Sequence, residues 1–417
     1  MKSNHSSSKF FQYVLYGSLS LPLLIYLAAT FFARYVADDF CHFETVNSIG
    51  VLNFVAQFYQ TWTGSWAFVF GLGISKFLPV WVPAYAVLLV WIVVLIGFTR
   101  RWNPIFGLAL LVATFATIPD VISTTYIQAG LLKYSAPLVG VCLEAWLLAA
   151  FPDTAWAYAA FALTAIIAAA LGDIIGIVQI IALICLMINF PKYRNRLGIT
   201  FIAAIVGFLI VYLAPGTSGR QSAFPRPDLI LSILYAARAM GYPVAYAIRQ
   251  SPLAFITMML IAVFGTKHKV FTHLDRQRTK LQIVSILTTI IFLNFVCEFT
   301  AYYATSGPLA DRAELFPIFF TFAGFMWIGH LLGSLMEWKS QSALTISIGM
   351  LTVVGVVSAF GTASTMQGLA KAWDTRDHLM RTSGELTHLD VPLDIWDIEH
   401  PDVRACIISF YQRTANQ

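Results

Sequence analysis

Two adjacent acids, Asp38 and Asp39, follow the first long apolar run of the chain and precede the sequence Phe-Cys-His42. A carboxylate at a membrane edge is unfavourable unless it is hydrated, paired or bound to a metal. Such a group can act as a general base toward a hydroxyl or hold a divalent cation. It can equally cap the helix that starts near Phe40, since Asp is a good N-cap residue. Adjacent side chains point in different directions, so we expect only one of the two acids to be the working group.

Three cationic residues lie in other polar segments that adjoin apolar runs. Arg220 ends the stretch Ala214-Pro-Gly-Thr-Ser-Gly-Arg220, whose backbone N–H groups and Arg side chain can bind an anion, although Pro-Gly is also an ordinary turn. Arg312 adjoins Asp311 and Glu314. It can form a local salt bridge with these acids, or it can bind a lipid phosphate. Lys133 can meet a phosphate, and a lipid headgroup is the favoured partner for an isolated lysine.

Aromatic residues adjoin these charges. Trp62 and Trp66 flank Thr-Gly-Ser, and as tryptophans at a membrane interface they are interpreted first as anchors and second as surfaces on which a sugar can stack. Asp173 separates two apolar runs, and a turn is the favoured interpretation over a place in a cavity.

The composition indicates a membrane protein. The chain of 417 residues is 58% hydrophobic and 11% charged, whereas an ordinary soluble domain carries about 25% charged residues. The net charge of +5 is small and gives no reason to expect a nucleic-acid partner. We therefore predict an all-α, polytopic transmembrane bundle rather than soluble domains.

Roughly eleven apolar runs are long enough to be spans, given that a span needs about 20 apolar residues and fewer in a buried helix. They cover residues 10–33, 78–98, 104–119, 135–151, 155–171, 174–190, 198–214, 251–265, 281–298, 313–334 and 342–361.

The distribution of Lys and Arg predicts the orientation. With the N-terminus in the cytoplasm, about half of the 26 basic residues lie in roughly 45 residues of inner loop, and the rest are spread over roughly 170 outer residues. The C-terminus is then exterior. The predicted organisation is a transmembrane domain over 1–361 and a small exterior segment over 362–417, with exterior loops at 34–77, 119–134, 215–250 and 299–312. Cys41 and Cys406 both fall in exterior segments, where a disulfide between them can form.

Several short blocks resemble the GT-C superfamily of membrane glycosyltransferases, in an uncharacterised bacterial branch. They are ADDFCHF, YQTWTGSW, STTYIQAGLLKYSAPL, LAPGTSGR, GPLADRAELFP and HPDVRACIISFYQ, and they occur in the same order as in that branch. Two positions depart from its pattern. Thr217 stands where Asn often follows Pro-Gly, and Ser65 stands where a basic residue often precedes Trp.

The resemblance implies a GT-C-like fold in the cytoplasmic (inner) membrane and transfer of a sugar, with inversion, from a polyprenyl-phosphate donor on the non-cytoplasmic side. The acceptor would be a cell-envelope glycan, lipid or protein. Asp38 or Asp39 would be the base. Donor and acceptor would be bound by the remaining candidates, which are Arg220, Arg312, Lys133, Tyr134, Trp62, Trp66 and His42.

A divalent cation stays open as a cofactor, because members of the superfamily differ in their need for one. The main alternative function is a transporter or lipid flippase for a glycolipid. Transporters more often carry intramembrane charges and inverted repeats, whereas the clear mid-span acid here is Glu144.

Overall fold

The computed structural model describes residues 4–36, 38–225, 228–266, 276–336, 340–384, 386 and 401–415, and every regular element among these residues is helical. The elements that extend along the bundle are α1 (Asn4–Ala29), α5 (Trp81–Thr99), α6 (Pro104–Phe115), α9 (Ala136–Ala150), α10 (Ala155–Leu171), α11 (Asp173–Asn189), α12 (Arg194–Tyr212), α16 (Pro252–Phe264), α17 (Arg276–Thr305), α18 (Leu315–Met336) and α19 (Gln341–Thr382).

Shorter helices connect them. These are α2 (Asp38–Ile49), α3 (Val51–Thr61), α4 (Trp66–Ser75), α7 (Val121–Thr125), α8 (Gln128–Gly130), α13 (Pro215–Ser222), α14 (Leu229–Ala239), α15 (Tyr242–Gln250) and α20 (Pro401–Ala415), with 3-10 turns at Thr30–Phe32, Pro191–Tyr193 and Asp311–Glu314 and a π-helical turn at Leu131–Ser135.

Each predicted apolar run coincides with one of the helices that extend along the bundle, so the protein is a multi-pass helical membrane protein. Eight helical stretches within the described residues are long and apolar enough to cross a bilayer. Seven of them coincide with predicted spans, and the eighth, Leu229–Gln250, covers α14 and α15. Four of the predicted spans, at α6, α10, α11 and α16, are shorter apolar helices. A short helix in such a bundle can be accommodated because its neighbours bury it.

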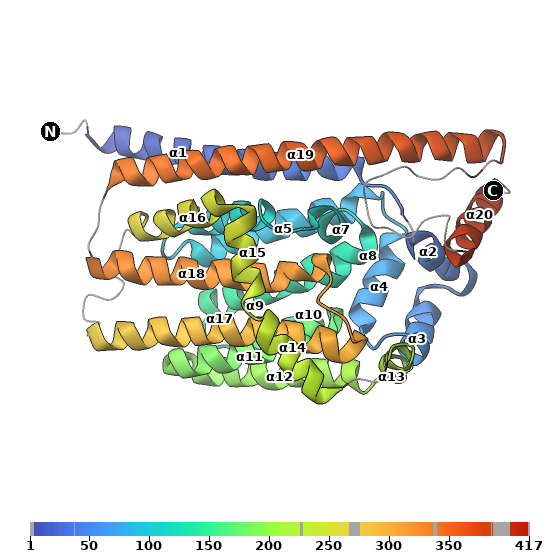
Figure 1. Ribbon diagram of the computed structural model, residues 1–417, viewed down its shortest axis with the longest axis horizontal. Coiled ribbons are helices and arrows are strands. Elements are labelled where there is room, and N and C mark those ends of the chain that lie inside the picture. Colours follow the sequence, from blue (N-terminus) through green and yellow to red (C-terminus); the bar gives the residue numbers. More distant parts are fainter. Residues whose placement is uncertain are drawn as a thin grey trace.

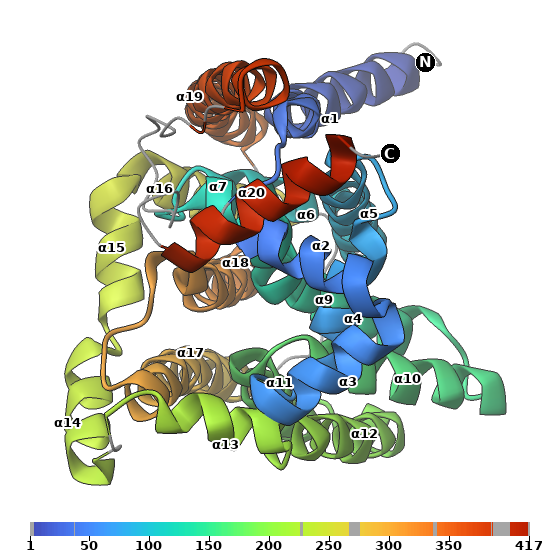
Figure 2. The ribbon, with the colours of Figure 1, turned by 90° about the vertical axis from the view of Figure 1, so that its right-hand side faces the viewer.

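Helices α14 and α15 differ from the others in direction. They run across the outside of the bundle rather than along it (Figure 1), and in the end-on view they lie along one edge beside α17 and α18 (Figure 2). Their outward side chains are apolar, with Ile230 69% and Leu234 60% exposed. The predicted exterior loop 215–250 is therefore largely helical, and this part of it presents an apolar face suited to lipid.

Close packing of small residues holds the bundle together. The contact between α10 and α12 is built on small residues, with Ala169 of α10 fully buried opposite Gly207 of α12 and Ala204 of α12 also fully buried. On α18, a Cβ at Gly333 would lie 2.1 Å from the carbonyl oxygen of Val263 in α16, so the two backbones touch. Small residues allow such close approach, and the resulting van der Waals contact is what drives helix association in lipid.

The last apolar helix is longer than the sequence predicts. Helix α19 continues without a break to Thr382, so residue 361 lies inside it and the predicted exterior segment begins within a helix. The extension reaches past the end of α1, at the end of the bundle that carries α2, α3 and α20 (Figure 1). Helices α2 and α3 are separate because Gly50 adopts a positive φ of 79° between them.

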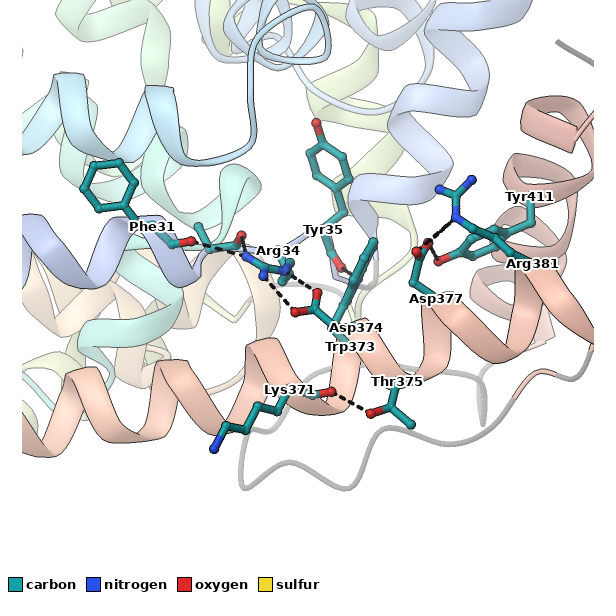
Figure 3. A network of polar contacts seen from close by, with 11 residues as sticks. Phe31, Arg34, Tyr35, Lys371, Trp373, Asp374, Thr375, Asp377, Arg381 and Tyr411 are labelled. Carbon is teal, nitrogen blue, oxygen red and sulfur yellow. Dashed lines mark hydrogen bonds and ion pairs between the residues drawn. The ribbon is translucent and has the colours of Figure 1, made fainter.

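The extension of α19 braces the chain that leaves α1. Arg34 forms a two-bond ion pair with Asp374 at 2.9 and 3.0 Å, and the indole N–H of Trp373 donates to the carbonyl of Tyr35 at 2.7 Å (Figure 3). Tyr411 of α20 donates to Asp377 at 2.8 Å.

A disulfide completes this brace. Cys41 of α2 is bonded to Cys406 of α20 across 365 positions of sequence. Beside it, a small apolar cluster joins α2, α19 and α20 through Phe40, Met380 and Ile407. The predicted exterior segment is thus attached to the helix that carries the two acids, and the disulfide that the sequence allowed is present.

Candidate functional site

Four side chains form a polar ring at the end of the bundle that carries α2, α3 and α13. Lys133 Nζ donates to Ser65 Oγ at 3.0 Å, and Ser65 Oγ donates to Asp173 Oδ1 at 3.0 Å. The Asp173 carboxylate also pairs with Lys133 at 3.7 Å and with Arg220 at 3.8 Å. The single carboxylate of Asp173 therefore pairs with two cations, Lys133 and Arg220, so the ring has a net positive charge.

The helix ends explain why these residues meet. Asp173 is the first residue of α11, where an acid is favoured by the positive end of the helix dipole. Lys133 lies in the π-helical turn Leu131–Ser135, and such turns alter the direction of side chains and are frequent at functional sites. Ser65 directly precedes α4, and Arg220 lies in the last turn of α13.

Two glycines let α13 approach the end of α3. A Cβ at Gly216 would lie 2.6 Å from the backbone N of Trp62, and one at Gly64 would lie 2.1 Å from the carbonyl oxygen of Val211. Thr217 connects the same segments, since its hydroxyl donates to Val211 O at 2.7 Å and accepts from Gly64 N at 3.0 Å. Thr217 therefore fixes the position of the segment that leads to Arg220.

The ring is open to a ligand on one side. The Arg220 and Asp173 side chains are about one-third exposed, at 35% and 34%, while Lys133 is more enclosed at 18%. The Arg220 guanidinium lies 5.9 Å from the ring of Trp62, which is itself 48% exposed. Two partly exposed cations beside an exposed indole can bind an anionic group that is attached to a flat or ring-shaped molecule.

The two neighbouring acids of α2 have different environments. Asp38 is exposed at the N-terminus of the helix, whereas Asp39 has no exposed surface. Asp39 accepts a hydrogen bond from Val36 N–H at 3.2 Å. Burial raises the pKa of Asp39 to about 7, against a smaller opposite effect of the N–H groups of Val36 and Ala129. Asp39 is therefore partly protonated at neutral pH, and Asp38 is the acid that solvent can reach.

His42 lies one helical turn after Asp38. Its ring is 5.3 Å from that of Phe58 and 5.9 Å from that of Phe54. Burial lowers the pKa of His42, and the charge of Asp38 acts in the opposite direction. His42 therefore contacts helix α3. The other end of α3 lies beside α13, where Trp62 follows the helix. Helix α3 thus lies between the two acids and the cationic ring.

A second connection runs through α8. Asp39 faces the backbone N–H of Ala129, and Ala129 lies four residues before Lys133. The acids and the cations therefore belong to one continuous part of the fold.

The other predicted residues lie further from the ring. Tyr134 contacts Phe316 of α18 with ring centroids 6.0 Å apart. Trp66 packs against Ala170 and Val211 in a small apolar cluster. Arg312 is exposed in the 3-10 turn before α18 and takes no part in the ion pairs of the ring.

Two members of the ring, Asp173 and Ser65, were not predicted as site residues from the sequence. A turn was the favoured interpretation of Asp173, and Ser65 stood only as a departure from a family pattern. The available signal was weak: an acid directly after a glycine between two apolar runs, at the predicted exterior edge. Nothing in the sequence indicated that Ser65, 108 positions away from Asp173, would hydrogen-bond to it.

Within the described residues, no three His, Cys, Asp or Glu side chains converge so that they could hold a metal ion. No protein-family model and no curated protein matches this chain.

Proposed function

We propose that the protein is a membrane glycosyltransferase that takes a sugar from a polyprenyl-phosphate donor on the non-cytoplasmic side of the cytoplasmic membrane. The observation that carries the proposal is the surplus positive charge of the ring formed by Ser65, Lys133, Asp173 and Arg220, at the same end of an apolar bundle as an exposed acid, Asp38. A lipid-linked phosphate needs a cationic site beside an apolar bundle, since its tail stays in the bilayer and its charge must be stabilised. The acceptor hydroxyl needs a base, for which Asp38 is available.

The disulfide supports the non-cytoplasmic side. Disulfides persist in oxidising compartments and are rare in the cytosol. The Cys41–Cys406 bond lies at the end of the bundle that carries the ring. The excess of Lys and Arg in the loops of the opposite end favours the same orientation.

Each group then has a role in the displacement. The acceptor hydroxyl attacks the anomeric carbon, and its proton passes to the Asp38 carboxylate. The new glycosidic C–O bond forms as the C–O bond to phosphate breaks, and the electron pair of that bond leaves with the phosphate. Lys133 and Arg220 stabilise the charge that develops on the phosphate. Attack from the side opposite the leaving group inverts the anomeric centre.

The two acids have separate roles in this scheme. Asp38 is the base because it is exposed and projects from a helix N-terminus. Asp39 positions the start of α2 through its bond to Val36 N–H. Trp62 offers a face on which the sugar can stack beside Arg220.

A transporter or flippase is the second candidate, and one observation favours it. Among the described residues, the carboxyl groups of Glu144, Glu298 and Glu314 are buried in the bundle, and that of Glu144 accepts a hydrogen bond from Gln179. Buried acids inside membrane helices often mark ion or proton pathways.

The deciding experiment uses purified protein in proteoliposomes with radiolabelled polyprenyl-phosphate hexoses and a delipidated cell-envelope fraction as acceptor. We expect label to move from lipid to the acceptor with wild-type protein. Asp38→Asn should reduce the rate by a factor on the order of 10² to 10⁴, the usual contribution of a general base. The matched variant Asp39→Asn should retain most of the activity.

Two results would refute the proposal. Full activity in Asp38→Asn would remove the assigned base. Movement of the labelled lipid between leaflets, with no new glycosidic bond, would identify the protein as a flippase instead.

A further inference from the structure

The polar ring formed by Ser65, Lys133, Asp173 and Arg220 places an acid between its two cations. Asp173 Oδ2 lies 3.7 Å from Lys133 Nζ and 3.8 Å from Arg220 Nη1. Both distances are longer than a charge-assisted hydrogen bond, which spans about 2.7 to 2.9 Å. The carboxylate therefore offsets the charge of the cations without occupying their N–H donors. A site that only had to hold an anion would bind it more tightly without this acid.

The net charge of the ring depends on Lys133, Asp173 and Arg220. Among the described residues, the charges that act on Lys133 are those of Asp173 and Arg220, and the charges that act on Asp173 are those of Lys133 and Arg220. Two cations and one carboxylate leave one net positive charge. Removal of the carboxylate would leave two.

The phosphate gains negative charge during the proposed transfer. A phosphate that joins a polyprenol to a sugar is a diester and carries one negative charge. When its C–O bond to the sugar breaks, it becomes a monoester, and a monoester carries two negative charges above a second pKa of about 6. The ring therefore balances the charge of the donor fully and the charge of the released phosphate only by half.

Asp173 is positioned to act on such a ligand directly. Its side chain is 34% exposed and that of Arg220 is 35% exposed, and the Arg220 guanidinium lies beside the exposed indole of Trp62. A phosphate that contacts Lys133 and Arg220 would lie about 5 Å from the carboxylate, where unit charges repel each other appreciably even at the dielectric constant of water. This repulsion doubles when the charge of the ligand doubles.

We propose that Asp173 is a specificity-determining residue that weakens the binding of a doubly charged phosphate monoester more than that of a singly charged phosphodiester. The inference rests on the proposed transferase function. In that reaction the donor binds as a diester, and Asp173 repels the monoester that is left after the sugar has moved. The acid thus promotes release of the product and frees the ring for the next donor molecule.

The test measures the binding of two lipids with the same tail, citronellyl phosphate and methyl citronellyl phosphate, to full-length protein in nanodiscs at pH 8. The first is a monoester with two charges, and the second is a diester with one. Affinities are measured by calorimetry and corrected for partitioning into empty nanodiscs. Asp173→Asn should tighten binding of the diester roughly threefold and that of the monoester roughly tenfold, because the removed charge, about 5 Å away, acts once on a single charge and twice on a double charge.

Two variants separate charge from other effects. Asp173→Asn keeps an oxygen that can accept the hydrogen bond from Ser65 Oγ at 3.0 Å. Asp153→Asn removes an acid that pairs with Arg196 at the opposite end of α10 from Asp173, and it should change neither affinity.

The wild-type protein alone gives a further result. With one net charge in the ring, the monoester should bind only about threefold more tightly than the diester. This measurement stands even if Asp173→Asn fails to fold.

Several results would overturn the inference and leave the proposed transferase function intact. Unchanged affinities in Asp173→Asn, or equal gains for the two lipids, would show that the charge of Asp173 does not act on the ligand. A loss of affinity would show that Asp173 holds the cations in place. A wild-type preference for the monoester of about tenfold or more would show that the carboxylate does not offset a cation.

Two other results would overturn the inference together with the proposed function. They are wild-type protein that binds neither lipid, and inorganic phosphate that binds as tightly as the lipids. In either case the ring is not a site for a lipid-linked phosphate.

Discussion

The buried carboxyl of Asp39 leads to a quantitative prediction for the variant Asp39→Asn. Asn has nearly the same shape and can still accept the hydrogen bond that Val36 N–H donates at 3.2 Å. It cannot ionise, however. The variant therefore removes the pH dependence of this side chain and leaves its packing almost unchanged.

The magnitude follows from the pKa of Asp39, which burial raises from 3.8 to about 7. Below the lower value the carboxyl is protonated in the folded and the unfolded protein. Between the two values the unfolded chain ionises while the folded protein retains its proton, so stability falls as the pH rises. From about pH 5 to about pH 8 the wild-type protein should lose about 2 to 3 kcal/mol relative to Asp39→Asn.

The assay is thermal unfolding of both proteins in nanodiscs across that pH range, with hydrogen exchange of the α2 amides as a local measure. Asp38→Asn is the matched control, because it changes an exposed acid on the same helix. Loss of its charge removes only a smaller cause of the raised pKa of Asp39, so the fall in stability with rising pH should remain. Parallel profiles for wild-type protein and Asp39→Asn would refute the reasoning. So would a wild-type protein that gains stability over the variant as the pH rises.

Three further predictions concern the ring and its supports. Lys133→Met removes a charged hydrogen-bond donor worth about 1.5 to 3 kcal/mol. The affinity for a short-chain polyprenyl phosphate, measured by calorimetry, should therefore fall at least tenfold. An unchanged affinity would exclude Lys133 from phosphate binding. Cys406→Ser removes a disulfide worth about 2 to 5 kcal/mol and should make α20 sensitive to limited proteolysis; equal protection in variant and wild type would show that the apolar contacts suffice. Gly64→Ala places a methyl group against the backbone of Val211 and should lower stability by about 1 to 3 kcal/mol in thermal unfolding. Gly17→Ala is the comparison that should not lower stability, because a Cβ there meets nothing and Ala is favoured over Gly inside a helix.

Much of the fold could be predicted because its determinants are local. A run of apolar residues identifies a helix in lipid whatever it packs against, since the backbone must satisfy its own hydrogen bonds there. This is why each predicted run coincides with a helix, from α1 to α19. The ends were less predictable, because α19 continues to Thr382 on a more polar sequence whose residues Trp373 and Asp374 are stabilised by contacts with Tyr35 and Arg34.

The sequence by itself determined that the chain is a helical membrane protein with its polar residues gathered in the connections of one end, and it identified the cysteines and most of the charged residues that matter there. The tertiary structure alone decided which side chains meet. Lys133 and Asp173 pair because the π-helical turn before α9 and the start of α11 lie side by side. Likewise, Asp39 is buried and Asp38 is exposed because one face of α2 packs inward. Apolarity is a property of each segment, whereas the rotation and depth of one helix against another depend on all of its neighbours.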